Sequence, residues 1–406
     1  MDVGTILAII GVIIFLGFLG EFIFRKTNIP DVIWLILIGI LVGSVLRWVS
    51  PADLARGAPI FTTFALLFIL FESALSINIT QFIKEVPSGT ILSIISFIFS
   101  VAIVALAMLA FGFEPLFALL TGMTLGGVSS AVVIPMVKNI TIGKKTQLIL
   151  IIESSLSDVL CIVGVISVMQ IIVLQSFDTA TVLNNIFGSF AIALFIGTIA
   201  SLLWMLVLRK SRSIAASYML TIAALLVVYG FTEYIKSNGA IACLAFGLVL
   251  GNSKTITQKL VKRGNDVLDS AAKSFYSELS FFVKTFSFVY LGILINFQFW
   301  LPFIIGLLLV IAIFLVRPLA IKLCIRKKVD LKDTIILESL IPKGLAAAIL
   351  VQLPVQAGLP NSTFIANVVL SAVLFSIIIS SILIFLIEQN YHASFGEIYR
   401  NLFKNF

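Results

Sequence analysis

Residues 91–111 read ILSIISFIFSVAIVALAMLAF and contain no charged side chain. A helix needs about 20 predominantly apolar residues to cross the hydrocarbon core of a bilayer, so this run is long enough to span a membrane. Similar runs recur along the 406 residues, of which 60% are hydrophobic and only 11% are charged. Soluble domains carry about 25% charged residues. The sequence therefore predicts a polytopic membrane protein and excludes a soluble one.

The apolar runs are continuous, whereas the strands of a transmembrane β-barrel alternate apolar and polar residues over about ten positions. We therefore expect an all-α fold with about 13 transmembrane helices. The first run lacks the basic segment and cleavage site of a signal peptide, so it is interpreted as a retained helix. The expected spans cover residues 3–24, 30–49, 59–83, 87–111, 114–137, 146–175, 180–208, 213–235, 239–253, 275–296, 299–321, 333–353 and 363–388.

The basic residues indicate the orientation of these spans. If the N-terminus is outside, the outer loops hold only Arg47, Arg56 and Lys236 of the 27 Lys and Arg residues. Most of the others fall in cytoplasmic loops, which is the positive-inside pattern of membrane proteins. We therefore expect a multi-pass protein of the cell (inner) membrane with a cytoplasmic C-terminus. The same pattern accounts for the net charge of +8 without nucleic acid as a partner.

Several kinds of chemistry are not expected. Cys161, Cys243 and Cys324 lie in apolar runs and the single histidine is His392, so no disulfide framework or zinc spacing is present. The sequence also has no glycine-rich ATP-binding loop of the Walker type. We therefore expect no cofactor and no ATP-driven enzyme, so that any transport by this protein would be secondary and driven by an ion gradient.

Charged residues inside the apolar runs require a reason, because a charge at the bilayer centre costs at least about 2.5–3.5 kcal/mol. Lys284 and Glu338 lie near the cytoplasmic ends of their spans and are expected to reach the interface. The charged residues within the spans are Glu72, Glu153, Asp158, Lys284, Arg317, Glu338 and Lys343.

Glu153 and Asp158 lie on one predicted helix, in the segment ESSLSD of residues 153–158. Five residues correspond to about 7.5 Å along the axis and to directions about 140° apart, so the two carboxylates need different partners. Ser154, Ser155 and Ser157 lie between them and add oxygen ligands without adding charge. Carboxylate and hydroxyl oxygens form sites for hard cations. A buried carboxyl group can also hold a proton, so this segment suits the exchange of a cation for H⁺.

Two spans contain residues that interrupt helices. Residues 126–135 read GGVSSAVVIP, and residues 341–348 read IPKGLAAA. Interrupted helices at corresponding places in two halves are typical of transporter binding sites. The two spans are the fifth and the twelfth of the chain. Successive spans alternate in direction across the membrane, so two spans that are seven apart run in opposite directions. The pattern therefore predicts an inverted repeat with two crossed, broken helices.

These segments resemble the monovalent cation/proton antiporters, in particular the NhaP/NHE-like branch of sodium/proton exchangers. Residues 66–75, LLFILFESAL, resemble a family segment that usually reads LLFLLFEGGL. Residues 153–158 resemble its ion-binding motif ESLLND, and residues 126–135 and 342–349 resemble its two crossover helices.

The resemblance implies roles for the residues at the two crossover helices. Asp158 would bind the cation, Na⁺ as the metal ion, or the proton. Oxygens of Ser154, Ser155, Ser157, Ser129 and Ser130 would complete this site. Ser157 stands where this branch has Asn and electrogenic relatives have Asp, and Ser129-Ser130 replace the family's Thr-Asp.

The other buried charges would support the site. Glu153 would form an ion pair with Lys343, which stands where the family usually has arginine. Arg317 would neutralise half-helix dipoles or carbonyls near the crossover.

The resemblance also implies a domain organisation and a homodimer in the lipid bilayer. Residues 1–86 and 211–297 would form the dimerisation scaffold, and residues 177–210 would be a linker helix. Residues 87–176 and 298–390 would form the transport core, and residues 391–406 a short cytoplasmic tail.

We therefore expect an antiporter that exchanges a monovalent cation, Na⁺ first, for H⁺ in pH homeostasis by alternating access. One titrating carboxylate suggests electroneutral one-for-one exchange. A K⁺/H⁺ antiporter is the first alternative. A sodium-coupled symporter for an organic anion and an ion channel are the others. The direction of exchange, the pH set point and the role of Glu72 stay open.

Overall fold

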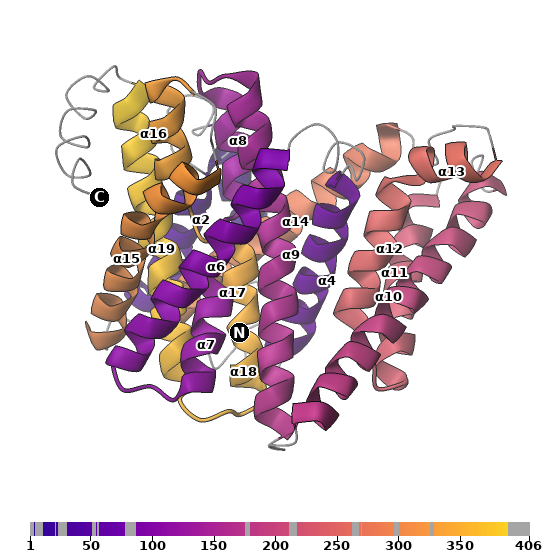
Figure 1. The fold of residues 1–406 in the computed structure, drawn as a ribbon, viewed down its shortest axis with the longest axis horizontal. Helices are drawn as coiled ribbons and strands as arrows, with labels where there is room; N and C mark the ends of the chain where they lie inside the picture. Colours follow the sequence, from indigo (N-terminus) through magenta and orange to yellow (C-terminus); the bar gives the residue numbers. More distant parts are fainter. Residues whose placement is uncertain are drawn as a thin grey trace. The chain divides into compact units, whose positions relative to one another are not determined.

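The computed structural model describes residues 4, 11–20, 22, 31–50, 54, 57–77, 87–174, 179–210, 217–261, 268, 270–295, 300–324 and 329–388. Within these ranges the regular structure is entirely helical (Figure 1). The helices are α2 (Asp31–Ile40), the π-helix η1 (Leu41–Val45), α4 (Ala58–Ser76), α6 (Pro87–Ala110), α7 (Pro115–Leu125), α8 (Ser130–Asn139), α9 (Lys144–Leu174), α10 (Thr179–Lys210), α11 (Ser217–Tyr234), α12 (Gly239–Gly251), α13 (Ser253–Val261), α14 (Ser270–Leu294), α15 (Trp300–Cys324), α16 (Leu331–Ser339), α17 (Leu345–Leu350), α18 (Gln352–Gln356) and α19 (Ser362–Glu388).

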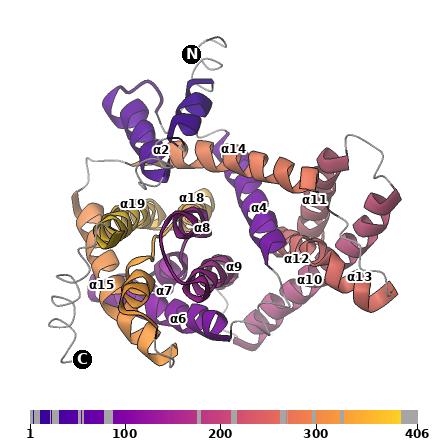
Figure 2. The same ribbon diagram turned by 90° about the horizontal axis from the view of Figure 1, so that it is seen from above.

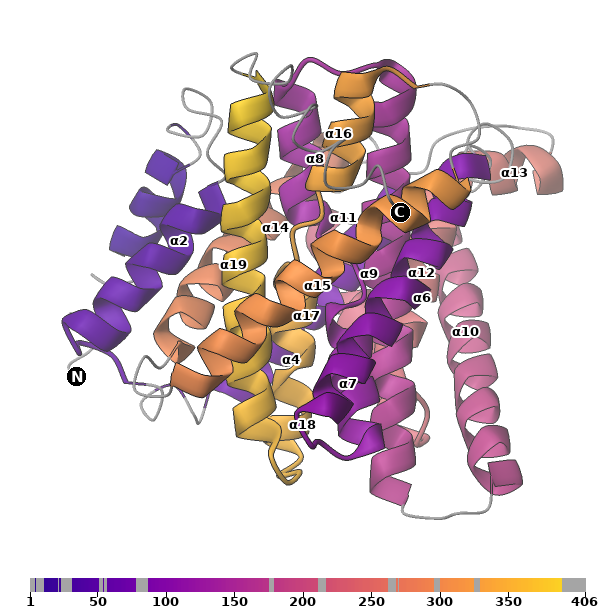
Figure 3. The same cartoon turned by 60° about the vertical axis from the view of Figure 1, so that its left-hand side comes forward.

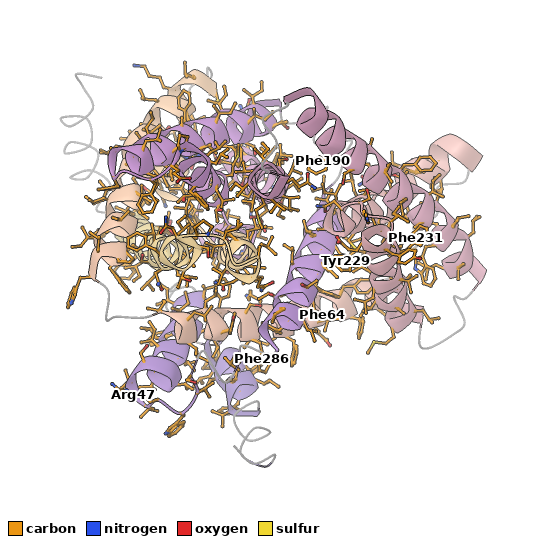
Figure 4. The ribbon with its side chains drawn as sticks, turned by 90° about the horizontal axis from the view of Figure 1, so that it is seen from below. Arg47, Phe64, Phe190, Tyr229, Phe231 and Phe286 are labelled. Carbon is orange, nitrogen blue, oxygen red and sulfur yellow. The ribbon has the colours of Figure 1, made fainter. Side chains whose placement is uncertain are left out.

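The helices agree with the spans predicted from the sequence. Seven described segments are long and apolar enough to cross a membrane, and six shorter apolar helices accompany them. Each predicted span overlaps one of these segments. Large apolar side chains such as Phe195, Leu203 and Phe231 are exposed, and side chains project from the outer sides of the helices as well as between them (Figure 4). The prediction of an all-α membrane protein is confirmed.

The chain divides into two compact units. Unit 1 contains residues 1–59, 86–164 and 284–406, and unit 2 contains residues 60–85 and 165–283. Most of the predicted transport core therefore lies in unit 1, together with residues that the sequence analysis assigns to the scaffold. The assignment of scaffold, linker and core concerns function and stays a prediction, and the tail lies outside the described residues.

Unit 2 is built around the packing of α12 against α10 and α11. A Cβ atom at Gly197 of α10 would lie 2.9 Å from the Ala242 carbonyl carbon of α12, so only glycine allows the two backbones to approach this closely. At the end of α12, the Asn252 side chain donates to the carbonyls of Ile77 and Leu248 at 2.7 and 2.8 Å.

In unit 1, α15 packs against α6 and α19, and α6 packs against α7 (Figure 2). The start of α9 is joined to the first turn of α16 by Asp333. This carboxylate accepts hydrogen bonds from the Thr146 hydroxyl at 2.7 Å and from the Gly143 N–H at 3.2 Å. The contact fixes the first turn of α16 to the N-terminal end of α9.

Both predicted interruptions are present in unit 1. α7 ends at Leu125 and α8 begins at Ser130, after the Gly126-Gly127 pair. α16 ends at Ser339 and α17 begins at Leu345, and Figure 3 shows α16 on one side of this interruption and α17 and α18 on the other. We call residues 126–129 the first break and residues 340–344 the second break.

The residues of the breaks explain why the helices stop there. Pro342 cannot donate a backbone hydrogen bond, and it disfavours helical geometry in the residue before it. Two glycines in succession lower helix propensity by about 1 kcal/mol each relative to alanine. Pro135, in contrast, lies within α8 and does not end it.

Candidate ion-binding site

The carboxylate of Asp158 lies at the start of a half-helix. Asp158 belongs to α9 and is 6% exposed. Its Oδ2 accepts hydrogen bonds from the Ser130 hydroxyl at 2.5 Å and from the Ser130 N–H at 3.4 Å. Ser130 is the first residue of α8, and the N-terminus of a helix carries partial positive charge. The second half of the broken helix therefore presents an N–H, a hydroxyl and a favourable dipole to this carboxylate.

Ser157 connects α9 to the first break. Its Oγ accepts a hydrogen bond from the Val128 N–H at 2.9 Å. The same hydroxyl lies 3.2 Å from two carbonyl acceptors, those of Val128 and Ser154. A hydroxyl has one proton and two lone pairs, so these contacts occupy most of its capacity. Ser157 precedes Asp158 in the sequence, but its hydroxyl bonds to the backbone of the first break and not to the carboxylate.

The other predicted ligands lie in the same two segments. The Ser154 hydroxyl donates to the carbonyl of Ile151 at 3.2 Å, and Ser155 is buried. Ser129 faces the second break, because a Cβ atom at Gly344 would collide with its side chain. The hydrogen bonds described for the Asp158 carboxylate come from Ser130, so the structure brings these two predicted residues together directly.

Glu153 forms its ion pair with Arg317 of α15. The guanidinium bonds both carboxylate oxygens, Nη1 to Oε1 and Nη2 to Oε2, the second at 2.8 Å. Both side chains are 1% exposed. Nη1 also donates to Ser96 Oγ at 2.6 Å, and Nε and Nη2 donate to the carbonyl of Leu337 at 3.0 and 2.9 Å. Arg317 therefore joins α6, α9, α15 and α16.

Lys343 is not the partner of Glu153 that the sequence analysis expects. Its Nζ donates instead to the carbonyl of Gly127 in the first break, at 2.8 Å, and the side chain is 2% exposed. The physical reason is the direction of the two carboxylates on α9. Glu153 faces Arg317, whereas the face of α9 that carries Ser157 and Asp158 meets the break that Lys343 also reaches.

The two breaks are bonded to each other. The Ser129 N–H of the first break donates to the Pro342 carbonyl of the second at 2.8 Å, and Lys343 Nζ makes the return contact. Both cations bond to backbone carbonyls at the C-terminal ends of half-helices, where the helix dipole is negative. Arg317 contacts the last turn of α16, and Lys343 contacts a carbonyl just after α7. The charges thus match the polarity of the half-helices, and the neutralising role expected for Arg317 stays a prediction.

Two features of this site were missed by sequence reasoning. The Ser376 hydroxyl of α19 accepts the Lys343 N–H at 2.8 Å, and Ser96 bonds Arg317. Both lie in apolar spans that contain several other serines, so nothing in the sequence singles them out. Within the described residues no three His, Cys, Asp or Glu side chains cluster as a metal site. A cation here would therefore have one carboxylate, with hydroxyl and carbonyl oxygens as its other ligands.

Comparison with known proteins agrees with this architecture. The family model described as "Sodium/hydrogen exchanger, transmembrane" matches residues 11–388. The chain is 24% identical over 368 residues to Na(+)/H(+) antiporter 1 of Methanocaldococcus jannaschii, covering 86% of this chain and 83% of the relative. These relatives are transporters and not enzymes.

Two solved structures share the fold. Both are of the sodium proton antiporter MjNhaP1 from Methanocaldococcus jannaschii, one at pH 8 and one described as a 3D EM map. Each is 20% identical and covers 96% of this chain. The first has a TM-score of 0.74 over 99% of its own chain, and the second 0.73 over 98%. Because the family match extends over nearly the whole sequence, the chain belongs to the sodium/hydrogen exchanger family.

Proposed function

We propose that this protein is a secondary antiporter that exchanges a monovalent cation, Na⁺ first, for H⁺ across the cell (inner) membrane. The observation that carries the proposal is the Asp158 carboxylate, buried beside the first break and bonded to Ser130. A single buried carboxylate can be neutralised by a proton or by a cation, but it cannot carry both. Family membership and the antiporters named above support this choice of ions.

Ser130 can serve both states of the carboxylate. Its N–H is a fixed donor at the start of α8, whereas its hydroxyl can rotate. The hydroxyl donates to Asp158 across the 2.5 Å contact. When a cation binds, the hydroxyl turns a lone pair toward it and the N–H alone holds the carboxylate. We propose Ser154, Ser155 and backbone oxygens near Ser129 as the remaining ligands.

Exchange follows from competition at Asp158. Protonation releases the cation, and cation binding releases the proton. A neutralised site can cross the membrane interior at a much lower cost than a bare carboxylate, so an empty carrier returns poorly. Residues 87–176 and 298–390 are proposed as the moving core in alternating access. Residues 1–86 and 211–297 are proposed as the dimer scaffold, with residues 177–210 as the linker.

The test is transport by purified protein in proteoliposomes with a pH-sensitive dye inside. Addition of Na⁺, Li⁺ or K⁺, one at a time, should drive proton flux with at least one of them, and the order of rates assigns the cation. Asp158→Asn should stay folded and lose this flux. Asp330→Asn is the matched control, because Asp330 is exposed and its side chain makes no capping bond.

Two results would contradict the proposal. Asp158→Asn with more than about a tenth of the wild-type rate would move the site elsewhere, since hydrogen-bond geometry alone cannot replace a titrating group. Cation flux without coupled proton flux would indicate a channel or a symporter.

A further inference from the structure

In each break, one backbone N–H donates a hydrogen bond to a serine hydroxyl on a long helix that comes later in the chain, α9 for the first break and α19 for the second. The Val128 N–H donates to Ser157 Oγ of α9 at 2.9 Å, and the Lys343 N–H donates to Ser376 Oγ of α19 at 2.8 Å. Val128 lies two residues before the start of α8, and Lys343 lies two residues before the start of α17. The two contacts therefore occupy equivalent positions in the two halves of the repeat.

The serines satisfy groups that the interruption of a helix leaves unpaired. A backbone N–H without a partner costs several kcal/mol in the interior of a membrane. Ser157 and Ser376 are 2% and 0% exposed, so no bulk water competes for these contacts. Ser376 is itself anchored, because its hydroxyl donates to the Val373 carbonyl at 2.8 Å. Each serine thus fixes one residue of a break to a continuous helix.

The equivalence extends to the contacts between the breaks. Gly127 and Pro342 each lie three residues before their second half-helix, and each carbonyl accepts a hydrogen bond from the opposite break. A displacement of one break therefore changes the bonds that hold the other. Because the first break leads directly into Ser130, the contact of Ser376 with the second break can influence the donors of Asp158.

The two halves differ in the residues that touch the ion. The residue after Ser157 is Asp158, whereas the residue after Ser376 is Ile377. The first residue of α8 is Ser130, whereas the first residue of α17 is Leu345. The serine contact thus persists in the half where no carboxylate follows it. The role that the two serine contacts share is therefore to fix the geometry of the break and not to coordinate a cation.

We propose that Ser157 and Ser376 are paired positioning residues that hold the two breaks in the arrangement in which Ser130 meets Asp158. This inference rests on the proposed antiport function. It assigns a role to Ser376, which has no contact with Asp158 among the described hydrogen bonds. It also replaces the ligand role predicted for Ser157 by a positioning role.

The test compares Ser376→Ala and Ser157→Ala with the wild type in proteoliposomes, measuring initial rates against Na⁺ concentration and Tm in detergent. Both variants should raise the Na⁺ KM by roughly two- to tenfold, the range that the loss of one hydrogen bond allows. Ser376→Thr, which keeps a hydroxyl, should recover the wild-type KM. The double variant should raise KM by less than the product of the single effects, because the two breaks are bonded to each other.

Ser381→Ala is the matched control on the same helix. The Ser381 hydroxyl bonds the Ile377 carbonyl one turn earlier in α19, so its removal should leave KM unchanged. If Ser376→Ala does not fold, Ser376→Cys keeps the side-chain volume with a poor hydrogen-bond acceptor and should show the same rise in KM.

The outcomes separate this inference from the proposed function. If the wild type drives no cation-coupled proton flux, antiport fails and this inference fails with it. If the wild type is active but Ser376→Ala and Ser376→Cys keep its KM, then Ser376 contributes to stability alone and the positioning role is overturned.

Discussion

At the scale of single residues, Arg317 makes five buried hydrogen bonds. Its guanidinium bonds Glu153, Ser96 and the Leu337 carbonyl, so each of its nitrogens has a partner. A cation can be kept in a membrane protein when its donors are satisfied in this way. The contacts also connect α9 to the C-terminal turn of α16, which leads into the second break.

Glu153→Gln is predicted to destabilise the fold more than it weakens cation binding. The change leaves the Arg317 cation without its counter-ion, and breaking a buried pair costs about 3–5 kcal/mol. Tm in detergent should therefore fall clearly, while the apparent Na⁺ affinity of the remaining folded protein changes little. Lys332→Gln is the control, since the Lys332–Glu388 pair is partly exposed and such pairs contribute about 0–1 kcal/mol. Equal losses of Tm in both variants would contradict a structural role for the Glu153–Arg317 pair.

The partner of Glu153 shows where sequence reasoning at this scale stops. The position of Glu153 on α9 predicts a buried cation as its partner, and the 140° divergence from Asp158 predicts separate environments. Arg317 and Lys343 both satisfy that requirement in sequence. Only the packing of α15 against its neighbours decides between them, and nothing in the local pattern of either span records that packing.

The two broken helices were predictable at the level of elements, because glycine and proline act locally. Gly126-Gly127, Pro342 and Gly344 mark the positions where α7 and α16 stop. The contacts across the breaks were not predictable. They join residues more than 200 positions apart, such as Ser129 and Pro342, and depend on how closely two backbones approach. Ser376 was missed because α19 contains several serines, and only the packing of α19 against the second break shows which of them accepts the Lys343 N–H.

Gly344→Ala should disrupt the crossing of the two breaks. A Cβ atom at this position would collide with the Ser129 side chain, in a segment whose backbone is bonded to the opposite break. We expect a loss of transport together with a fall in Tm, as overpacking typically costs about 1–3 kcal/mol. Gly230→Ala in α11 is the control, because nothing lies within 4 Å of the added Cβ atom. Wild-type transport by Gly344→Ala would show that the breaks can separate without loss of function.

At the scale of the whole molecule, the number of titrating groups at the site sets the charge moved in each cycle. The Ser157 hydroxyl carries no charge, and the Arg317 and Glu153 charges are paired with each other. In the proposed cycle, Asp158 carries either one proton or one monovalent cation in each direction. The proposed cycle moves no net charge across the membrane.

An imposed membrane potential should therefore leave Na⁺-driven proton flux unchanged. The measurement compares initial rates in tight proteoliposomes under potassium diffusion potentials of both signs, set with valinomycin. An assay with K⁺ as the sole cation comes first, to establish that K⁺ is not itself exchanged. A several-fold change in rate that depends on the sign of the potential would reveal a second group that carries protons and would contradict one-for-one exchange.

The reciprocal bonds between the breaks have a consequence for synthesis of the chain. Gly127 and Ser129 enter the bilayer long before Pro342 and Lys343 leave the ribosome, so their polar groups wait for partners that do not yet exist. During that interval the Ser129 N–H and the Gly127 carbonyl lack the partners that the complete chain gives them, and an unsatisfied backbone group is costly inside a membrane. An N-terminal half produced alone should therefore be recognised by membrane quality control and degraded. Co-production of the missing half should prevent this degradation. The stability of the first half would then depend on when the second half is synthesised, as well as on its own sequence.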